Sequence, residues 1–102
     1  MQEFIEAKRD EIAELCRTHH VRRLSIFGSA VRDDFNPETS DVDVRVEFNP
    51  EALDNYVRNL HSLHDRLAEM FGRKVDIISS EVIPNRYLRK EIDDTQVTLY
   101  AA

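Results

Sequence analysis

Two carboxylates that stand two residues apart, Asp41 and Asp43, are the first residues of this sequence whose spacing could do chemistry. On a strand, residues two apart project from the same face, so these two side chains are expected to lie side by side. Carboxylates that close repel each other unless a cation lies between them. Mg²⁺ prefers oxygen ligands and often takes one or two carboxylates together with substrate phosphates. The pair therefore predicts a magnesium site.

Three further features could complete a phosphate-handling site around this pair. Gly28-Ser29 follows a short apolar run, and a glycine turn lets backbone N–H groups approach a phosphate closely. The Ser29 hydroxyl can donate to a terminal phosphate oxygen, and Arg32 can neutralise charge on a leaving pyrophosphate. Asp76 could help to bind a second metal, about 3.5–4 Å from the first. If residues 29–34 begin a short helix, the partial positive charge of its N-terminus also attracts the phosphate. Together these residues predict phosphoryl transfer by positioning and electrostatics.

Alternating helices and strands are expected to position these side chains. The segment 42–48 alternates valine or phenylalanine with charged residues, which predicts a strand with one apolar face. The connection between the strands at 24–27 and 42–48 is too short for a helical crossover, so we expect antiparallel neighbours in a mixed sheet. The fold class is therefore α/β (α+β), a small mixed sheet flanked by helices. The other predicted elements are a helix over 3 to about 19, a loop over 33–40, a helix from Asn49-Pro50-Glu51 to Gly72, a strand over 74–79, a helix over 87–92 and a short strand over 96–100.

Length and composition limit the classes of protein that fit. A chain of 102 residues is expected to be a single domain over 1–102. Its 14 Lys plus Arg against 20 Asp plus Glu give a formal net charge of −6, which argues against an autonomous nucleic-acid binder and favours a protein partner. Cys16 is the single cysteine, so an intrachain disulfide is excluded and a reducing cytoplasm is expected. No signal peptide or membrane-spanning apolar run is apparent in the sequence.

The motifs resemble those of the DNA-polymerase-β-like nucleotidyltransferase superfamily. Gly28-Ser29, then eleven residues, then Asp41-Val42-Asp43 is similar to the signature of that superfamily. The wider segments resemble the small, stand-alone minimal nucleotidyltransferases, and the similarity runs from about Ile26 to Tyr100. These segments are Phe27-Gly28-Ser29-Ala30-Val31-Arg32, Ser40-Asp41-Val42-Asp43-Val44 and Lys74-Val75-Asp76-Ile77-Ile78.

The resemblance implies Mg²⁺-dependent transfer of a nucleoside monophosphate to a protein hydroxyl. AMP from ATP is the expected group. It implies catalytic roles for Ser29, Asp41, Asp43 and Asp76, metal binding by the three aspartates, and triphosphate binding by Gly28, Ser29 and Arg32. Many small members resemble antitoxins paired with a HEPN-domain toxin, which they silence by adenylylating a tyrosine or by binding. A homo- or hetero-oligomer would fit such a role.

Two alternatives stay open at this point. The chain departs from the family pattern at Val31 and Asp33, where small residues are usual, and this keeps open a module that masks a toxin by binding alone. A structural subunit of a larger transferase is the other alternative.

Several other residues have simpler interpretations. His61, His64 and Asp65 have a spacing that could bind a metal, but a polar helix face is the preferred interpretation because no further ligand is near in sequence. Cys16 is expected to be a small core residue. The three tyrosines are expected to be partly buried core aromatics: Tyr56, Tyr87 and Tyr100.

Overall fold

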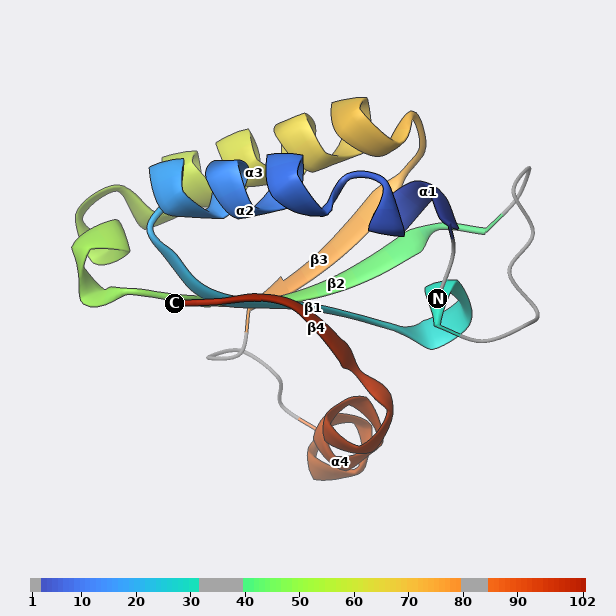
Figure 1. Cartoon of the computed structure of the whole chain (residues 1–102). Coiled ribbons are helices and arrows are strands. Elements are labelled where there is room, and N and C mark those ends of the chain that lie inside the picture. Colours follow the sequence, from blue (N-terminus) through green and yellow to red (C-terminus); the bar gives the residue numbers. More distant parts are fainter. Residues whose placement is uncertain (1–2, 32–39, 80–84) are drawn as a thin grey trace.

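The computed structural model describes residues 3–31, 40–79 and 85–102, and it contains a four-stranded sheet with helices on both faces (Figure 1). The sheet order is β3-β2-β1-β4. Helices α2 and α3 cover one face, and α4 lies on the other. The strands are β1 (Val21–Phe27), β2 (Val42–Phe48), β3 (Val75–Ser79) and β4 (Val97–Ala101). The helical elements are α1 (Glu3–Glu6), α2 (Arg9–Thr18), η1 (Gly28–Ala30), η2 (Pro50–Asn55), α3 (Tyr56–Phe71) and α4 (Arg86–Thr95).

The pairing of the strands confirms the predicted mixed sheet. β1 runs antiparallel to β2 and to β4, whereas β2 and β3 are parallel. Because β1 and β2 are antiparallel, the last residues of β1 lie beside the first residues of β2, at one end of the strands. The first residues of β3 lie at the same end, since β3 is parallel to β2. Three strand ends that could carry the chemistry therefore meet there.

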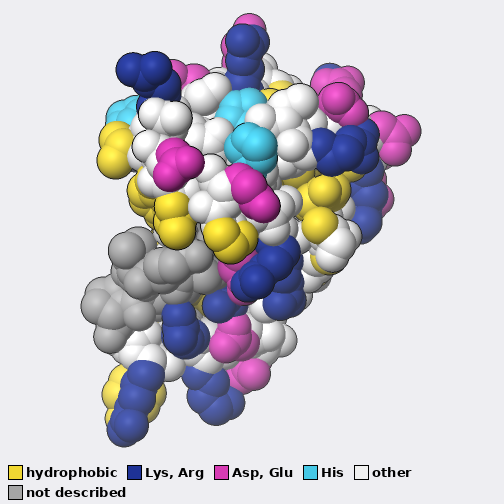
Figure 2. All heavy atoms as spheres, turned by 90° about the vertical axis from the view of Figure 1, so that its left-hand side faces the viewer, with side chains coloured by type: hydrophobic (Ala, Val, Ile, Leu, Met, Phe, Trp, Pro, Cys, Tyr) yellow, Lys and Arg dark blue, Asp and Glu magenta, His cyan; other side chains and the backbone are white. Residues whose placement is uncertain are grey.

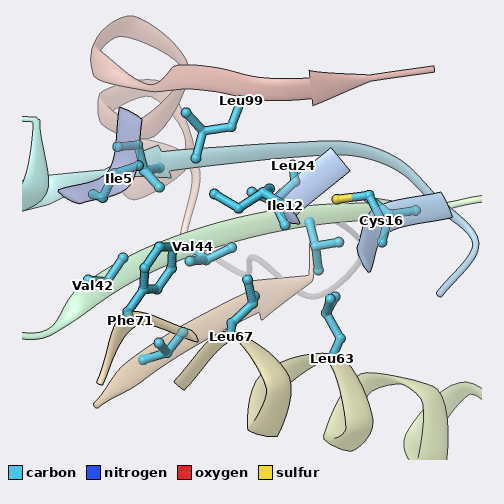
Figure 3. Close-up of a cluster of buried hydrophobic side chains, with 14 of the residues drawn as sticks. Ile5, Ile12, Cys16, Leu24, Val42, Val44, Leu63, Leu67, Phe71 and Leu99 are labelled. Atoms are coloured by element: carbon cyan, nitrogen blue, oxygen red, sulfur yellow. The ribbon is translucent and has the colours of Figure 1, made fainter. Parts of the chain in front are cut away.

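The apolar face of β2 anchors the core, as its alternation predicts. Val42, Val44 and Val46 are fully buried, and Leu63 and Leu67 of α3 pack into the same cluster (Figure 3). Fully burying such side chains contributes about 1.5–3 kcal/mol each, so this layer holds β2 firmly. The intervening charged residues of β2 consequently face the side of the sheet where α4 lies.

The predicted single helix over 3–19 is wrong, because the structure divides it into α1 and α2. The Lys8 N–H donates to the Ile5 carbonyl, a three-residue step, and the regular four-residue pattern resumes when the Ile12 N–H donates to Lys8. The break lets the Phe4 ring pack edge-on against Phe71, with 5.9 Å between ring centroids, while Ile5 remains fully buried. Tertiary packing therefore overrides the continuous helical pattern.

The segment after β2 is helical as predicted but begins differently. Residues 50–55 form the 3₁₀ turns of η2 before α3 begins, and the Asn49 side chain makes no capping hydrogen bond within the described structure. Leu53 and Val57 follow the helical spacing of the apolar residues in this segment, which predicts that they are buried, but they are 65% and 67% exposed. The tighter 3₁₀ winding changes the angular spacing of side chains, which turns these two away from the core. Gly72 ends α3 in the left-handed conformation, as predicted.

Polar contacts hold α4 to the second face of the sheet. Ile92 is the buried residue of α4, and the guanidinium of Arg45, on β2, pairs with the Asp93 carboxylate of α4. Arg45 is only 8% exposed. α4 thus supplies a partner for this buried charge. A solvated charged face of β2, the alternative to a metal site at Asp41 and Asp43, does not hold at Arg45, which is buried and pairs with α4.

The remaining predictions have mixed outcomes. The segment 96–100 forms the predicted strand, β4, and the Cys16 side chain is fully buried in the core. Tyr56 and Tyr100 are partly buried against the core, but Tyr87 is 72% exposed because it begins α4, at the rim of the sheet. Within the parts of the chain that are described, the structure has no helix long and apolar enough to cross a membrane.

Candidate active site

A glycine turn packs directly on one of the predicted catalytic carboxylates. β1 ends at Phe27, which pairs in register with Asp43, and the chain then turns at Gly28 with φ of +72°. A Cβ atom placed on Gly28 would lie 2.4 Å from Asp43 Oδ2. Glycine is therefore required at position 28 for two reasons: the backbone has a positive φ, and there is no room for a side chain. The turn and the carboxylate form one unit.

Asp43 and Asp76 are brought together by the parallel pairing of β2 and β3. They occupy the same register position on these neighbouring strands, so their side chains project from the same face of the sheet. The Val42 N–H donates to the Lys74 carbonyl at 3.1 Å, which fixes this register at the beginning of both strands. Asp43 is half-buried and Asp76 is exposed, so the pair is open to a ligand from solvent.

Asp41 lies one residue before β2 and faces a cation that the sequence analysis did not single out. Its Oδ2 is 3.7 Å from the Nζ of Lys74, the residue before β3. Lys74 is 71% exposed and Asp41 34% exposed, so this ion pair contributes little to stability. It places a positive charge beside the predicted catalytic carboxylates, where β2 and β3 begin. Only the pairing of β3 with β2 reveals this, because Lys74 by itself resembles any residue before a strand.

The turn that the sequence predicts to bind phosphate is described in part. Ser29 is half-buried in η1, and the Val31 N–H donates to the Gly28 carbonyl at 3.1 Å, which closes the turn. The predicted helix start over 29–34 is seen only as this 3₁₀ turn. Arg32 and Asp33 lie outside the described residues.

The donor atoms of the site match the predicted metal. Asp41, Asp43 and Asp76 offer carboxylate oxygens, the ligands that Mg²⁺ prefers. Among the residues that the structure describes, no group of three or more His, Cys, Asp or Glu side chains is arranged to hold a metal ion unaided. A site built from two carboxylates and completed by substrate phosphates fits both facts, and Asp43, fixed against Gly28, is its best-placed ligand.

The histidines of α3 support β3. His64 Nε2 lies 3.0 Å from the carbonyl oxygen of Val75, and its Nδ1 lies 3.1 Å from the Asp65 carboxylate. His64 and Asp65 line an open pocket of about 300 Å³ together with Leu60, His61 and Ile77. His64 thus ties α3 to the first residue of β3, next to Asp76.

This arrangement of a glycine turn and strand-borne aspartates belongs to a known class of enzymes. The family model described as nucleotidyltransferase domain matches residues 9–98 of the chain. The chain therefore belongs to the nucleotidyltransferase family and has the polymerase-β-like nucleotidyltransferase fold. It is 33% identical over 92 residues to "Putative protein adenylyltransferase MJ1217" of Methanocaldococcus jannaschii, with 82% of this chain and 90% of that protein covered.

Solved structures support the same fold. A structure described as a putative minimal nucleotidyltransferase superposes with a TM-score of 0.79 at 28% identity, covering 93% of this chain and 92% of the other. A toxin–antitoxin structure with AMP-PNP gives 0.66 at 18% identity, covering 92% and 73%. The complex of a tri-AMPylated Shewanella oneidensis HEPN toxin with its MNT antitoxin gives 0.63 at 16% identity, covering 95% and 72%. Because the last two structures are only 18% and 16% identical to this chain, they show a shared fold and nothing more.

Proposed function

We propose that this chain is a Mg²⁺-dependent protein adenylyltransferase that transfers AMP from ATP to a protein hydroxyl. The observation that carries the proposal is the contact of Asp43 with the Gly28 turn, together with its in-register pairing with Asp76. The proposed phosphate-binding turn and the two carboxylates then lie together at one end of the strands, where solvent reaches them. The similarity to proteins named as putative protein adenylyltransferases supports the choice of ATP and of a protein acceptor.

Each described side chain has a role that its position supports, and the role of Arg32 rests on the sequence. Asp41 and Asp43 would hold Mg²⁺ with the triphosphate, and Asp76 would help to hold a second ion and accept the proton of the acceptor hydroxyl. The acceptor oxygen forms a bond to the α-phosphorus as the bond from that phosphorus to the bridging oxygen breaks, and pyrophosphate leaves. Mg²⁺ would supply charge neutralisation on the phosphates. The Gly28 backbone and the Ser29 hydroxyl bind the phosphates, and Arg32 neutralises the departing pyrophosphate. Lys74, whose Nζ lies 3.7 Å from Asp41 Oδ2, adds a further positive charge beside the proposed phosphate site.

The physiological role we propose is that of an antitoxin acting on a HEPN-domain toxin. Neighbouring folds include the MNT antitoxin in complex with a tri-AMPylated HEPN toxin.

Nucleotide binding is the first test. Thermal unfolding is measured with ATP, GTP, CTP and UTP, each with Mg²⁺ or EDTA, for the wild type and for Asp43→Asn. A ligand present at one hundred times its dissociation constant stabilises the folded state by about 2.7 kcal/mol. We expect a Mg²⁺-dependent rise that is largest with ATP and absent in Asp43→Asn. If no triphosphate raises the melting temperature in either condition, the nucleotide-binding role is wrong.

A second candidate function is neutralisation of a toxin by binding alone. The neighbouring toxin–antitoxin complexes favour it, since they show this fold seated on a toxin. The Asp41→Asn/Asp43→Asn variant separates the two functions in cells that express a HEPN toxin. Masking survives the double substitution, whereas protection by adenylylation is lost together with label transfer from [α-³²P]ATP.

A further inference from the structure

An exposed strip of apolar side chains runs along η2 and the beginning of α3. Leu53 is 65% exposed and Val57 is 67% exposed. Leu60 is half-buried and lies three residues after Val57, so the two side chains share one face of α3. We call Leu53, Val57 and Leu60 the α3 strip. Figure 2 looks onto the side of the molecule where Figure 1 draws η2, the green turn after β2, and it shows hydrophobic side chains with acidic side chains between them.

The α3 strip leads into an open pocket between α3 and β3. The pocket has a volume of about 300 Å³, and it is lined by Leu60, His61, His64, Asp65 and Ile77. Ile77 also packs against the hydrophobic core, so this side of the pocket is held in place. A preformed pocket beside exposed apolar side chains can receive an anchoring side chain of a binding partner.

Acidic side chains border the α3 strip. Glu51 and Asp54 of η2 are exposed. Within the described parts of the chain, neither carboxylate forms a hydrogen bond or an ion pair. Asp65, whose side chain is 76% exposed, lines the pocket beside His64. Arg58 is exposed as well, but the three carboxylates outnumber its single charge, so this border is acidic.

Charge and shape together select the kind of partner that fits the α3 strip. A second copy of this chain, whose net charge is −6, would bring the same carboxylates against one another in a two-fold contact. The carboxylates also repel the phosphates of nucleic acids and of anionic lipids. A helix that carries lysine or arginine beside an apolar face satisfies both properties. Its apolar face covers the strip, and its cations meet the carboxylates.

We propose that the α3 strip and its pocket bind a basic amphipathic helix of a partner protein. Apolar side chains of that helix cover Leu53 and Val57 and remove them from water, which supplies the driving force. One of its apolar side chains enters the pocket beside Leu60 and Ile77. Glu51 and the other carboxylates of the border pair with its cations, which orient the helix and select the charge of the partner.

A helix bound to the α3 strip leaves the candidate active site open. Asp43 lies at the beginning of β2, whereas η2 follows its end, and a strand of seven residues spans about 20 Å. Ile77 and Asp76 are neighbours on β3, and successive side chains of a strand point to opposite faces. The pocket and Asp76 therefore lie on opposite faces of the sheet. This inference goes beyond the proposed function, because binding of the partner does not depend on the nucleotide chemistry.

Fluorescence anisotropy with a designed peptide tests the apolar half of the proposal. The probe is a fluorescein-labelled amphipathic helix of leucine and lysine, with a leucine–glutamate counterpart and a scrambled leucine–lysine peptide as the alternatives. Dissociation constants are measured for the wild type, for Leu53→Ala/Val57→Ala and for the control Tyr87→Ala/Leu88→Ala, which removes the other exposed apolar pair. We expect the control to bind like the wild type and Leu53→Ala/Val57→Ala to bind about tenfold more weakly, the loss typical of a truncated anchor. Thermal unfolding verifies that each variant folds.

A second pair of variants tests the charged half. Glu51→Gln/Asp54→Asn removes two carboxylates from the border of the α3 strip, and Glu3→Gln/Glu91→Gln removes the same charge from α1 and α4, where both side chains are exposed. The first variant should bind the leucine–lysine helix more weakly than the second. Added salt should weaken binding by the wild type more than binding by Glu51→Gln/Asp54→Asn, because the lost contacts are charged and exposed.

Backbone amide NMR of the complex gives the location of binding, and the largest shift changes should fall over residues 51–65 and at Ile77. Changes centred elsewhere, equal affinity in all variants, no binding by the wild type, or equal binding of the acidic or scrambled peptide each overturns the inference. A wild-type dimer in sedimentation equilibrium that Leu53→Ala/Val57→Ala dissociates would also overturn it, because the occupant is then a second copy. The proposed function fails separately: peptide binding that depends on the α3 strip, without an ATP-induced thermal shift, removes the enzyme and leaves the docking surface.

Discussion

Substituting Gly28 with alanine should separate the cost of a strained backbone from the cost of a displaced carboxylate. Gly28 and Gly72 have positive φ values of +72° and +64°. Alanine in the left-handed region costs about 1–2 kcal/mol at either position. A change of 1 kcal/mol shifts the melting temperature of a domain this small by about 4–8 °C. Both variants should therefore unfold about 4–16 °C below the wild type.

The two glycines differ in what a new side chain would meet. A Cβ on Gly72 has nothing within 4 Å, whereas a Cβ on Gly28 lies 2.4 Å from Asp43 Oδ2. Ordinary contact begins at 3.4 Å, so the carboxylate must move by about 1 Å. Disturbing a group that orients a metal ligand typically costs about 10- to 100-fold in affinity. Gly28→Ala should therefore weaken Mg²⁺-dependent ATP binding by that factor, and Gly72→Ala should leave it unchanged.

Isothermal titration calorimetry with Mg²⁺ and ATP, below the melting temperature of each variant, makes the comparison. Equal ATP affinity for the two variants would refute the idea that the Gly28 turn fixes Asp43 for metal binding. A loss of affinity in Gly72→Ala as large as that in Gly28→Ala would show that general destabilisation is responsible.

Three other predictions concern the frame around the site. Burial raises the pKa of the Cys16 thiol to about 12, so an aromatic disulfide reagent at pH 8 should leave the folded protein unlabelled and label it in denaturant; rapid labelling of the folded protein contradicts the buried position. The hydrogen bond from Arg45 holds the pKa of Asp93 below its usual 3.8. The Arg45–Asp93 pair therefore stabilises the fold fully above pH 3.8 and loses this effect as the pH falls through the lower pKa that Asp93 has in the folded protein. The difference in unfolding free energy between the wild type and Asp93→Asn should consequently shrink below pH 3.8, and a difference that grows there would contradict the pairing. Leu63 is fully buried, so Leu63→Ala should lower the unfolding free energy by about 2–5 kcal/mol in urea denaturation, and a loss under 1 kcal/mol would mean that this part of the core is loosely packed.

Local patterns in the sequence determined most of the elements and the residues that line the site. The alternation along 42–48 predicted which side of β2 is buried, and the structure confirms Val42, Val44 and Val46 as core. Glycine at 28 predicted a turn, and glycine at 72 predicted a helix end. These predictions succeed because a two-residue period, a positive φ and a helix end are properties of a few consecutive residues.

Tertiary structure alone decided how those elements meet. The sequence named Asp76 as a candidate, but only the parallel pairing of β3 with β2 places it in register beside Asp43. The same pairing places Lys74 near Asp41, and the packing of α4 gives Arg45 its partner. The division of the first helix and the exposure of Tyr87 likewise depend on contacts distant in sequence. Strand order and helix docking are set by the burial of whole faces, a non-local free energy that no short window of residues contains.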